Sequence, residues 1–240
     1  MKGFDLREGL KNYYDSYYDS AIGREIHEIA AIGRATNIVS SCSGCPHDTL
    51  LEIGCGKGLV LEELSRRGFG IRYFGLEVSD SAVERTISRN IRGLVECQLF
   101  DGYSIPYEGR RFDLAILSHV LEHVEFPRKL LYEAGRVANY VFVEVPLEDN
   151  IRLRKDFVLG SIGHINFYTE KTIRFLIQTS GFEVVSQSVS NESLAYFKRG
   201  YGKKWLVYFA ITEIPFRVIP PIALKLFNYN CSMLCKPSGA

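Results

Sequence analysis

Short apolar runs and amphipathic helical segments alternate along most of this 240-residue chain. Apolar runs typical of buried strands occupy residues 49–53, 72–78, 94–100, 112–117 and 140–145, and Pro146 is expected to end the last of them. Apolar residues at helical spacing predict helices over 59–67, 82–89 and 127–137. A helix over 169–179 then leads to a sixth strand over 182–189, and residues 229–236 are expected to form a seventh. This alternation predicts a doubly wound α/β fold around a seven-stranded, mostly parallel sheet.

Two segments lie outside the alternation. Residues 1–40 begin with tyrosines between positions 13 and 18 and continue as an amphipathic helix over about 20–39, which predicts an N-terminal helical cap. The tyrosines suit packing against the main domain or a flap over a ligand. The other segment, residues 191–228, is rich in aromatic side chains and is predicted to be a substrate lid. The main domain would then comprise residues 41–190 and 229–240.

The apolar stretch from Trp205 to Phe227 needs separate consideration as a membrane segment. Charged residues interrupt it, and we expect Pro215, Pro220 and Pro221 to break any helix there, so a transmembrane span is not predicted. Peripheral contact of residues 203–227 with a membrane surface remains an alternative to the lid, because tryptophan and flanking lysines suit an interface.

Charge and cysteine content indicate which partners and which cellular compartment to expect. A formal net charge of +1 argues against a nucleic-acid partner, and residues 1–10 carry charges where a secretory leader would be apolar, so we expect a cytoplasmic protein. Six cysteines in this length favour reduced thiols. Cys42 and Cys45 have C-x-x-C spacing, but the spacing of Cys231 and Cys235 favours one face of a strand over a second half of a zinc site.

A glycine-rich turn follows the first predicted strand and precedes a helix. It reads Glu52-Ile53-Gly54-Cys55-Gly56-Lys57-Gly58. Glycines at this junction allow positive φ angles and close approach of a ligand to the main chain. The dinucleotide fingerprint would need its third glycine at Leu59, which disfavours a nicotinamide-dependent oxidoreductase.

Polar residues follow the other predicted strands in the same way. Glu77 ends the second strand, Asp101 and Gly102 follow the third, and residues 118–123 follow the fourth. Glu144 lies near the end of the fifth strand. The carboxyl ends of parallel strands share one edge of a sheet, so these residues are expected to border one ligand crevice.

Together these motifs resemble class I S-adenosylmethionine (SAM) dependent methyltransferases, which have a Rossmann-like fold. The resemblance rests on E-x-G-x-G-x-G, the strand-end acidic residues, the run FDLAILSHVLEHV at 112–124 and the segment 163–182. It is closest to the small-molecule branch that includes ubiquinone-biosynthesis O-methyltransferase-like enzymes. It implies methyl transfer from SAM, with S-adenosylhomocysteine (SAH) as product, to a small and mostly apolar acceptor, more readily at oxygen.

The resemblance also implies roles for individual residues. Those expected to bind the cofactor are Glu52, Gly54, Cys55, Gly56, Gly58, Glu77, Val78, Asp101, Gly102, Ser118 and His119. In particular, Glu77 would hold the ribose, and Asp101 with Gly102 the adenine end. His123 and His164 are the candidate catalytic bases, and no metal is required in this interpretation.

Two alternatives from other functional classes remain. His119, Glu122, His123 and the later His164 also resemble the metal-binding E-x-x-E-H…H arrangement of small-RNA 2′-O-methyltransferases, with histidine in place of the first glutamate. A SAM-fold protein that binds or scaffolds without catalysis is the other alternative.

Overall fold

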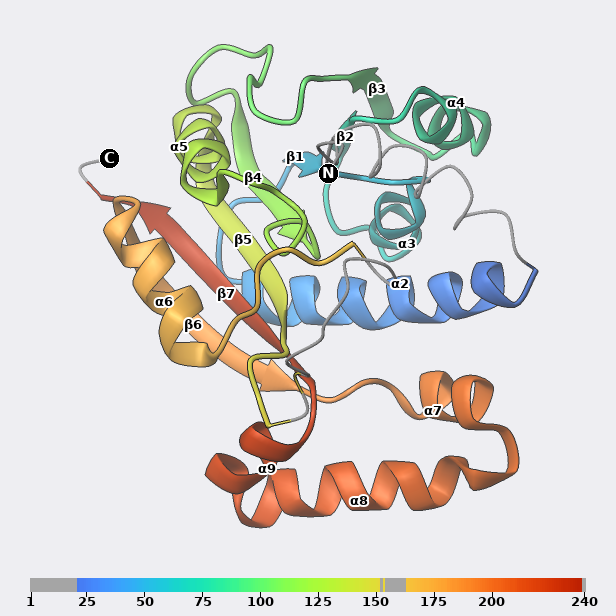
Figure 1. Cartoon of the computed structure of the whole chain (residues 1–240). Coiled ribbons are helices and arrows are strands. Elements are labelled where there is room, and N and C mark those ends of the chain that lie inside the picture. The colour runs from blue at the N-terminus through green and yellow to red at the C-terminus, as the bar shows by residue number, and fades with distance from the viewer. Residues whose placement is uncertain (1–20, 152, 154–162, 239–240) are drawn as a thin grey trace, which may run out of the picture.

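The computed structural model describes residues 21–151, 153 and 163–238, and it contains one seven-stranded sheet (Figure 1). The strands follow the spatial order β3-β2-β1-β4-β5-β7-β6. Their bounds are β1 Thr49–Ile53, β2 Arg72–Glu77, β3 Leu94–Leu99, β4 Phe112–Ser118, β5 Ala138–Leu147, β6 Phe182–Ser190 and β7 Tyr229–Pro237. The tyrosines predicted to form a flap lie outside the described residues.

The first five strands are parallel to one another, whereas β7 is antiparallel to both of its neighbours. β7 lies between β5 and β6: Tyr229 pairs with Leu147 at one end, and Pro237 pairs with Phe182 at the other. The predicted seven-stranded, mostly parallel α/β fold is confirmed. Because β7 runs the opposite way, its first residues lie beside the carboxyl end of β5.

Helices cover both faces of the sheet, and the last three along the chain lie below it in Figure 1. They are α2 Ala21–Cys42, α3 Leu59–Arg66, α4 Asp80–Ser88, α5 Pro127–Val137, α6 Glu170–Thr179, α7 Leu194–Tyr201, α8 Trp205–Val218 and α9 Pro220–Leu226, with a short 3₁₀ turn at Gly202–Lys204. Ser79 caps α4 by accepting the Ala82 N–H, and Thr169 with Thr172 forms a capping box on α6.

Two apolar cores result from the alternation of side chains along each strand. Leu51 belongs to one core with residues of α5 and α6, whereas its neighbour Leu50 belongs to the other with residues of α2 and α3. Ala35 and Ile38 of α2 are fully buried there. The described part of the N-terminal segment therefore packs on the sheet. The division of the chain into cap, main domain and insertion stays a prediction.

Two expectations about proline are wrong. β5 continues through Pro146 to Leu147, because the pairing with β4 ends at Glu144 and beyond it β5 pairs only with β7, so a proline is tolerated. Pro215 lies inside α8 and does not break it. The break falls instead before Pro220, where α8 has ended at Val218 and α9 begins, so the expectation is confirmed at that proline. Among the described residues, no helix has both the length and the apolar character needed to cross a bilayer.

All six cysteines are buried free thiols. Cys55 and Cys97 lie 3.7 Å apart through their sulfurs, and the Cys45 thiol donates to the Cys42 carbonyl. Within the described part of the chain, no group of three cysteines, histidines or carboxylates that includes a cysteine is close enough to hold a metal. The sulfurs are therefore part of the packed core, as the spacing of the second cysteine pair indicated.

Candidate functional site

The glycine turn between β1 and α3 requires glycine for two reasons. Gly54, Gly56 and Gly58 have φ angles of 73°, 54° and 73°, a region that side chains rarely adopt. A Cβ at Gly54 would lie 2.8 Å from Val120 Cγ2, and one at Gly58 would lie 2.7 Å from Thr86 Cγ2. The turn therefore packs tightly on its protein side and presents bare main chain to a ligand.

Glu77 joins the end of β2 to this turn. Its carboxylate accepts the N–H of Gly56 at 2.8 Å and the N–H of Val78 at 2.7 Å. Burial raises the pKa of Glu77, and these backbone bonds oppose that rise. A carboxylate has about four acceptor positions, so it can hold the turn and still accept from a ligand hydroxyl. Beside it, the Val78 side chain is 45% exposed.

Glu52 and Cys55, at the start of the turn, are both buried. Glu52 is buried in β1, and burial raises its pKa well above the ordinary value. Cys55 packs against Cys97 in the core. Among the described residues Glu52 Oε2 has no hydrogen-bond partner, and the expected roles of Glu52 and Cys55 at the cofactor stay predictions.

The loop after β3 meets the end of β2. The Asp101 carboxylate accepts the N–H groups of Tyr103 and Ser104 at 2.7 and 2.6 Å and the Ser104 hydroxyl at 2.8 Å. These bonds lower its pKa. Gly102 has a φ of 89°, and Val78 lies 3.6 Å from the place of its missing Cβ. Val78 and Gly102 therefore form adjoining walls, and Asp101 shapes the loop.

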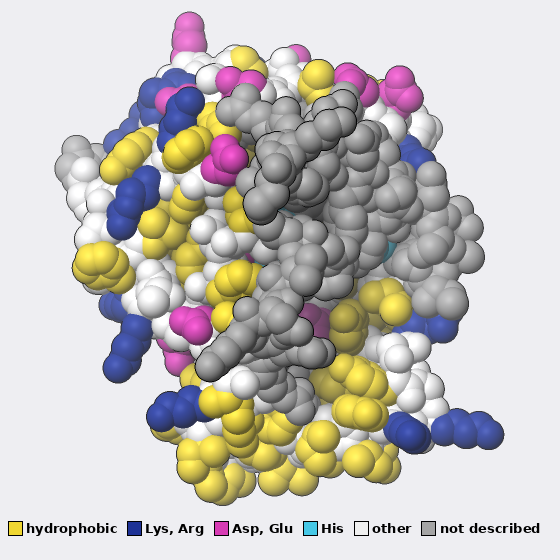
Figure 2. Space-filling model, viewed as in Figure 1, with side chains coloured by type: hydrophobic (Ala, Val, Ile, Leu, Met, Phe, Trp, Pro, Cys, Tyr) yellow, Lys and Arg dark blue, Asp and Glu magenta, His cyan; other side chains and the backbone are white. Residues whose placement is uncertain are grey.

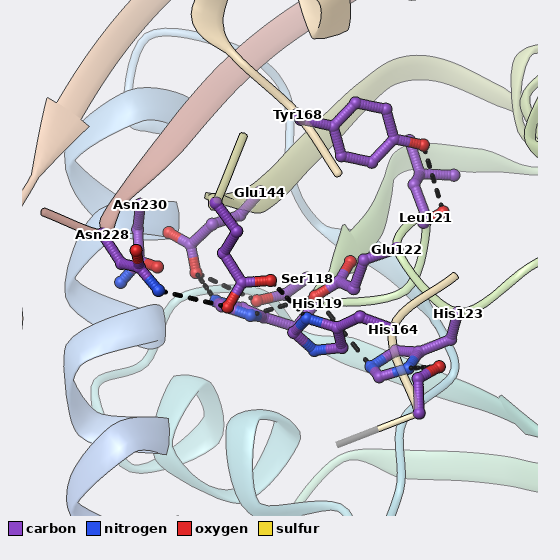
Figure 3. Close-up of polar contacts among 12 residues, drawn as sticks. Ser118, His119, Leu121, Glu122, His123, Glu144, His164, Tyr168, Asn228 and Asn230 are labelled. Carbon is purple, nitrogen blue, oxygen red and sulfur yellow. Dashed lines mark hydrogen bonds and ion pairs between the residues drawn. The ribbon is translucent and has the colours of Figure 1, made fainter. Parts of the chain in front are cut away.

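His119, Glu122 and Glu144 form a cluster of charged side chains, here called the buried charge cluster (Figure 3). His119 Nδ1 lies 3.2 Å from Glu122 Oε1, and its Nε2 lies 3.4 Å from Glu144 Oε1. Glu144 also accepts from Ser118, Ser232 and Asn37. His119 itself has a φ of 57°, which aims its ring at both carboxylates.

The cluster shifts the pKa of each member. Burial and the nearby Arg34 charge would lower the pKa of His119, but its contacts with Glu122 and Glu144 outweigh both and raise that pKa to about 8. Burial opposes ionisation of Glu122, yet the contact with His119 lowers its pKa to about 2. The pKa of Glu144 is lowered for the same reason. At neutral pH the cluster is therefore one imidazolium between two carboxylates.

His123 and His164, here called the histidine pair, lie beside this cluster with ring centroids 4.6 Å apart. The segment after residue 163 holds them together: the Asn166 amide donates to the carbonyls of Leu121 and Val124, at 2.9 and 2.7 Å. His123 Nδ1 lies 3.1 Å from the Gly163 carbonyl, and His164 Nδ1 lies 2.5 Å from Glu148 Oε2. Because both partners are acceptors, each Nδ1 carries the proton and Nε2 is the basic nitrogen. Burial lowers the pKa of His123, so it is neutral at pH 7.

The histidine pair and Glu122 could together hold a cation. Each offers a ligand atom, and the three atoms lie within 4.8 Å of one another. His119, the fourth residue of the predicted metal arrangement, is not part of this group and contacts the carboxylates instead. Two imidazoles and a carboxylate suit zinc, manganese or iron better than calcium.

The comparison that decides the family covers most of the chain: the model described as a methyltransferase domain matches residues 14–187. The chain belongs to the methyltransferase-domain family. Its curated relatives include the mitochondrial ubiquinone biosynthesis O-methyltransferase of Candida albicans, 31% identical over 93 residues, which are 35% of this chain and 27% of that protein. Norajmaline N-methyltransferase of Rauvolfia serpentina is 31% identical over 150 residues, which are 58% of this chain and 48% of that enzyme. The methyltransferase chain thus spans less than half the length of these relatives.

A solved structure also matches over nearly the full length. Magnesium protoporphyrin IX methyltransferase from Synechocystis PCC 6803, with bound SAM, has a TM-score of 0.61 and 13% identity, covering 99% of this chain and 100% of that one. At this identity the likeness shows the fold alone. It agrees with the seven-stranded sheet of this class I methyltransferase domain.

Two residues of the methyltransferase site were missed by the sequence analysis. Glu148 directly follows β5, so the rule of polar strand ends applied to it as well as to Glu144. Arg34 lies on α2 three residues before Asn37, which bonds Glu144, so both face the site. Its charge acts on Glu52 and His119. Within the described part of the chain its guanidinium has no hydrogen-bonded or ion-paired partner. No local pattern distinguishes it from other helix arginines.

Proposed function

We propose that this domain transfers a methyl group from SAM to oxygen of a small, mostly apolar acceptor. The observation that carries the proposal is that the glycine turn, Glu77 and the histidine pair all lie at the carboxyl edge of one parallel sheet. SAM supplies an activated methyl group on its sulfonium. The protein then has to align the acceptor, exclude water and take up the acceptor's proton.

The residues at this edge fit the chemical parts of SAM. The positive-φ turn admits the cofactor against bare main chain, and Glu77 retains acceptor capacity for ribose hydroxyls. Val78 and Gly102 offer an apolar and unobstructed wall suited to adenine. Arg34 supplies a guanidinium that has no ion-pair partner among the described residues, and that group suits the carboxylate of the methionine part.

The histidine pair supplies the proton acceptor in this proposal. Glu148 holds the Nδ1 proton of His164 and would stabilise the imidazolium that forms when Nε2 accepts a proton. His123 is already neutral at pH 7. His164 is therefore the stronger candidate for the base, with His123 as its neighbour on the acceptor side.

Three features support a small apolar acceptor. The apolar helices α8 and α9 directly precede β7 in the chain, and β7 begins beside the carboxyl end of β5. One curated relative carries a name that refers to the biosynthesis of ubiquinone, a mostly apolar compound. The net charge of +1 argues against a polyanionic acceptor such as RNA.

The test combines binding and transfer. Calorimetry should show that SAH binds with a micromolar dissociation constant. When a lipid extract is added with methyl-labelled SAM, the label should appear in the organic phase. Transfer of the label to water-soluble amines, with none in the organic phase, would contradict transfer to an apolar hydroxyl. Tight SAH binding without transfer to any extract would favour the non-catalytic scaffold instead.

A second candidate function follows from the geometry of Glu122 and the histidine pair. A divalent cation held there would lower the pKa of acceptor hydroxyls, as in metal-dependent RNA 2′-O-methyl transfer. Nδ1 of His164 bonds Glu148, and Nδ1 of His123 bonds the Gly163 carbonyl. With Nδ1 bonded in this way, Nε2 of each ring is the atom available to a metal.

This candidate predicts measurable metal affinity. Titration of chelator-treated protein with Zn²⁺ or Mn²⁺ should show one site, and His164→Ala should weaken it by about tenfold or more because one ligand is lost. The matched control is His47→Ala, since His47 stacks on Phe69 away from the group. Absence of a stoichiometric site in the wild type would remove this candidate.

A further inference from the structure

Helix α8 is apolar on the side that faces away from the protein. Its outer face, defined as Leu206, Val207, Ile211, Ile214 and Val218, is between 43% and 70% exposed, and no residue of the helix is buried. Val207, Ile211, Ile214 and Val218 recur at spacings of three and four, so they form one stripe. Ile219 and Ile222 extend the stripe into α9. A continuous apolar surface of this kind marks an interaction site.

The opposite side of α8 holds the helix firmly on the domain. Phe216 stacks on Tyr229 of β7 at 4.7 Å, and the Tyr229 hydroxyl donates to the Thr212 carbonyl at 2.7 Å. Phe209 packs edge-on against Phe197 of α7 at 5.5 Å. The outer face is therefore presented in a fixed orientation by a packed inner face.

Basic side chains surround the outer face. The insertion, residues 191–228, contains the basic residues Lys198, Arg199, Lys203, Lys204, Arg217 and Lys225 and the acidic residues Glu192 and Glu213. Of the basic residues, Arg199 pairs with Glu25 of α2 at 2.6 Å, which leaves the lysines as the free charges of this set in the described part of the chain. Both acidic groups have partners: Glu213 pairs with Arg217 at 2.7 Å, and Glu192 accepts from Asn230. Figure 2 shows the apolar surface at the lower end of the molecule with basic side chains on either side of it. The insertion is thus strongly basic within a chain of net charge +1.

The basic surround distinguishes between two occupants of the apolar face. A second copy of this chain in a two-fold dimer would bring the same lysines against one another, which is unfavourable. An anionic bilayer would bury the apolar stripe and attract the lysines at the same time. Trp205, with Lys198 4.9 Å above its ring, has the amphipathic character of an interfacial anchor.

We propose that α8 and α9 dock this domain on the surface of an anionic lipid bilayer. The docked face is close to the site, because the Ile151 N–H donates to the Lys225 carbonyl of α9 and Asn228 donates to Glu148. Bilayer docking itself is independent of methyl transfer. Its consequence, that the acceptor is a compound partitioned into the membrane, rests on the proposed function.

Co-sedimentation of the full chain with vesicles tests the docking. The chain should bind phosphatidylglycerol–phosphatidylcholine vesicles and bind pure phosphatidylcholine far less. Val207→Ser combined with Ile211→Ser and Ile214→Ser should reduce binding by about tenfold or more. Lys203→Gln with Lys204→Gln should reduce it by about 30-fold at low salt, because each basic residue near an anionic surface contributes about 1 kcal/mol.

Matched controls use equally exposed residues elsewhere. Ile71→Ser with Ile87→Ser and Val95→Ser changes three apolar residues that are 53% to 65% exposed, and Arg66→Gln with Lys171→Gln removes two exposed charges. Both controls should bind as the wild type does. Equal loss in controls and tests, or no vesicle binding by the wild type, would overturn the proposal.

Two further measurements separate the remaining outcomes. A dimer in sedimentation that the triple serine variant converts to monomer would assign the face to a second copy and overturn bilayer docking. SAH affinity is measured on the same samples. Retained SAH binding without vesicle binding rejects docking and leaves the proposed function standing, whereas vesicle binding without SAH binding rejects the function and keeps the docking.

Discussion

Replacing His119 with asparagine should lower the free energy of unfolding by about 3 to 5 kcal/mol at pH 6, because two buried carboxylates lose the cation between them. Glu122 and Glu144 are both fully buried, so water does not replace that cation. Asparagine tolerates the φ of 57° at this position, so the loss reports the charge contact and not backbone strain. Urea unfolding measures it.

The control uses another non-glycine residue of positive φ. Arg110→Asn, at φ 57° on an exposed loop, should change the free energy of unfolding by no more than about 0.5 kcal/mol. A similar loss in both variants would attribute the effect to backbone conformation. Addition of Glu144→Gln to His119→Asn should restore part of the stability, because one of the two uncompensated charges is removed.

The same cluster predicts a pH dependence with a definite sign. The pKa of His119 is raised from 6.5 to about 8 on folding, so its contribution is full below pH 6.5 and is lost as pH rises through 8. This amounts to about 2 kcal/mol. The pKa of Glu122 is lowered from 4.5 to about 2, so its contribution is present above pH 4.5 and is lost as pH falls through 2. The wild type should therefore lose stability between pH 6 and 8.5, and His119→Asn should not show that component.

Replacing Arg34 with methionine should weaken SAH binding by about 30- to 100-fold, the equivalent of about 2 to 3 kcal/mol for a charge-assisted contact. Methionine keeps the apolar stem on α2, so the helix packing of Ala35 and Ile38 is preserved. The proposed partner is the carboxylate of the amino-acid part, which 5′-methylthioadenosine lacks. Affinity for 5′-methylthioadenosine should therefore change by less than about twofold, well within ordinary surface effects.

Calorimetry with the two ligands decides between a contact and a general effect. Arg66→Met is the control, since Arg66 is exposed and pairs only with Glu63 at 3.0 Å. Equal weakening of both ligands in Arg34→Met would show that the arginine supports the fold of the turn and does not contact the carboxylate. No change for SAH would remove Arg34 from the proposed cofactor site.

The structure separates two groups of polar residues that are adjacent in the sequence. His119 forms ion pairs with Glu122 and Glu144, and all three side chains are largely or fully buried. His123, one residue after Glu122, packs against His164, and His164 in turn pairs with Glu148. The turn from 118 to 124 thus contributes His119 to the buried ion pairs and His123 to the histidine pair, and Glu122 contacts both groups.

The sequence by itself determined the elements that depend on local physics. Apolar runs of strand length and amphipathic spacing identified the strands and most helices, because both signals lie within a few neighbouring residues. The glycine turn and Glu77 could also be predicted from the sequence, since positive φ angles and strand ends have local signatures. From parallel strand order alone, these residues could be assigned to one edge of the sheet.

Only the tertiary structure decided the features that depend on non-local packing. The insertion of β7 between β5 and β6 joins segments far apart in the chain, and no local pattern specifies such a partner. The burial of Glu52 and Cys55, and the nearness of Arg34 to His119, follow from how β1 and α2 pack. The exposed face of α8 was equally hidden, because an apolar helix has the same composition whether its stripe is buried or presented to a bilayer.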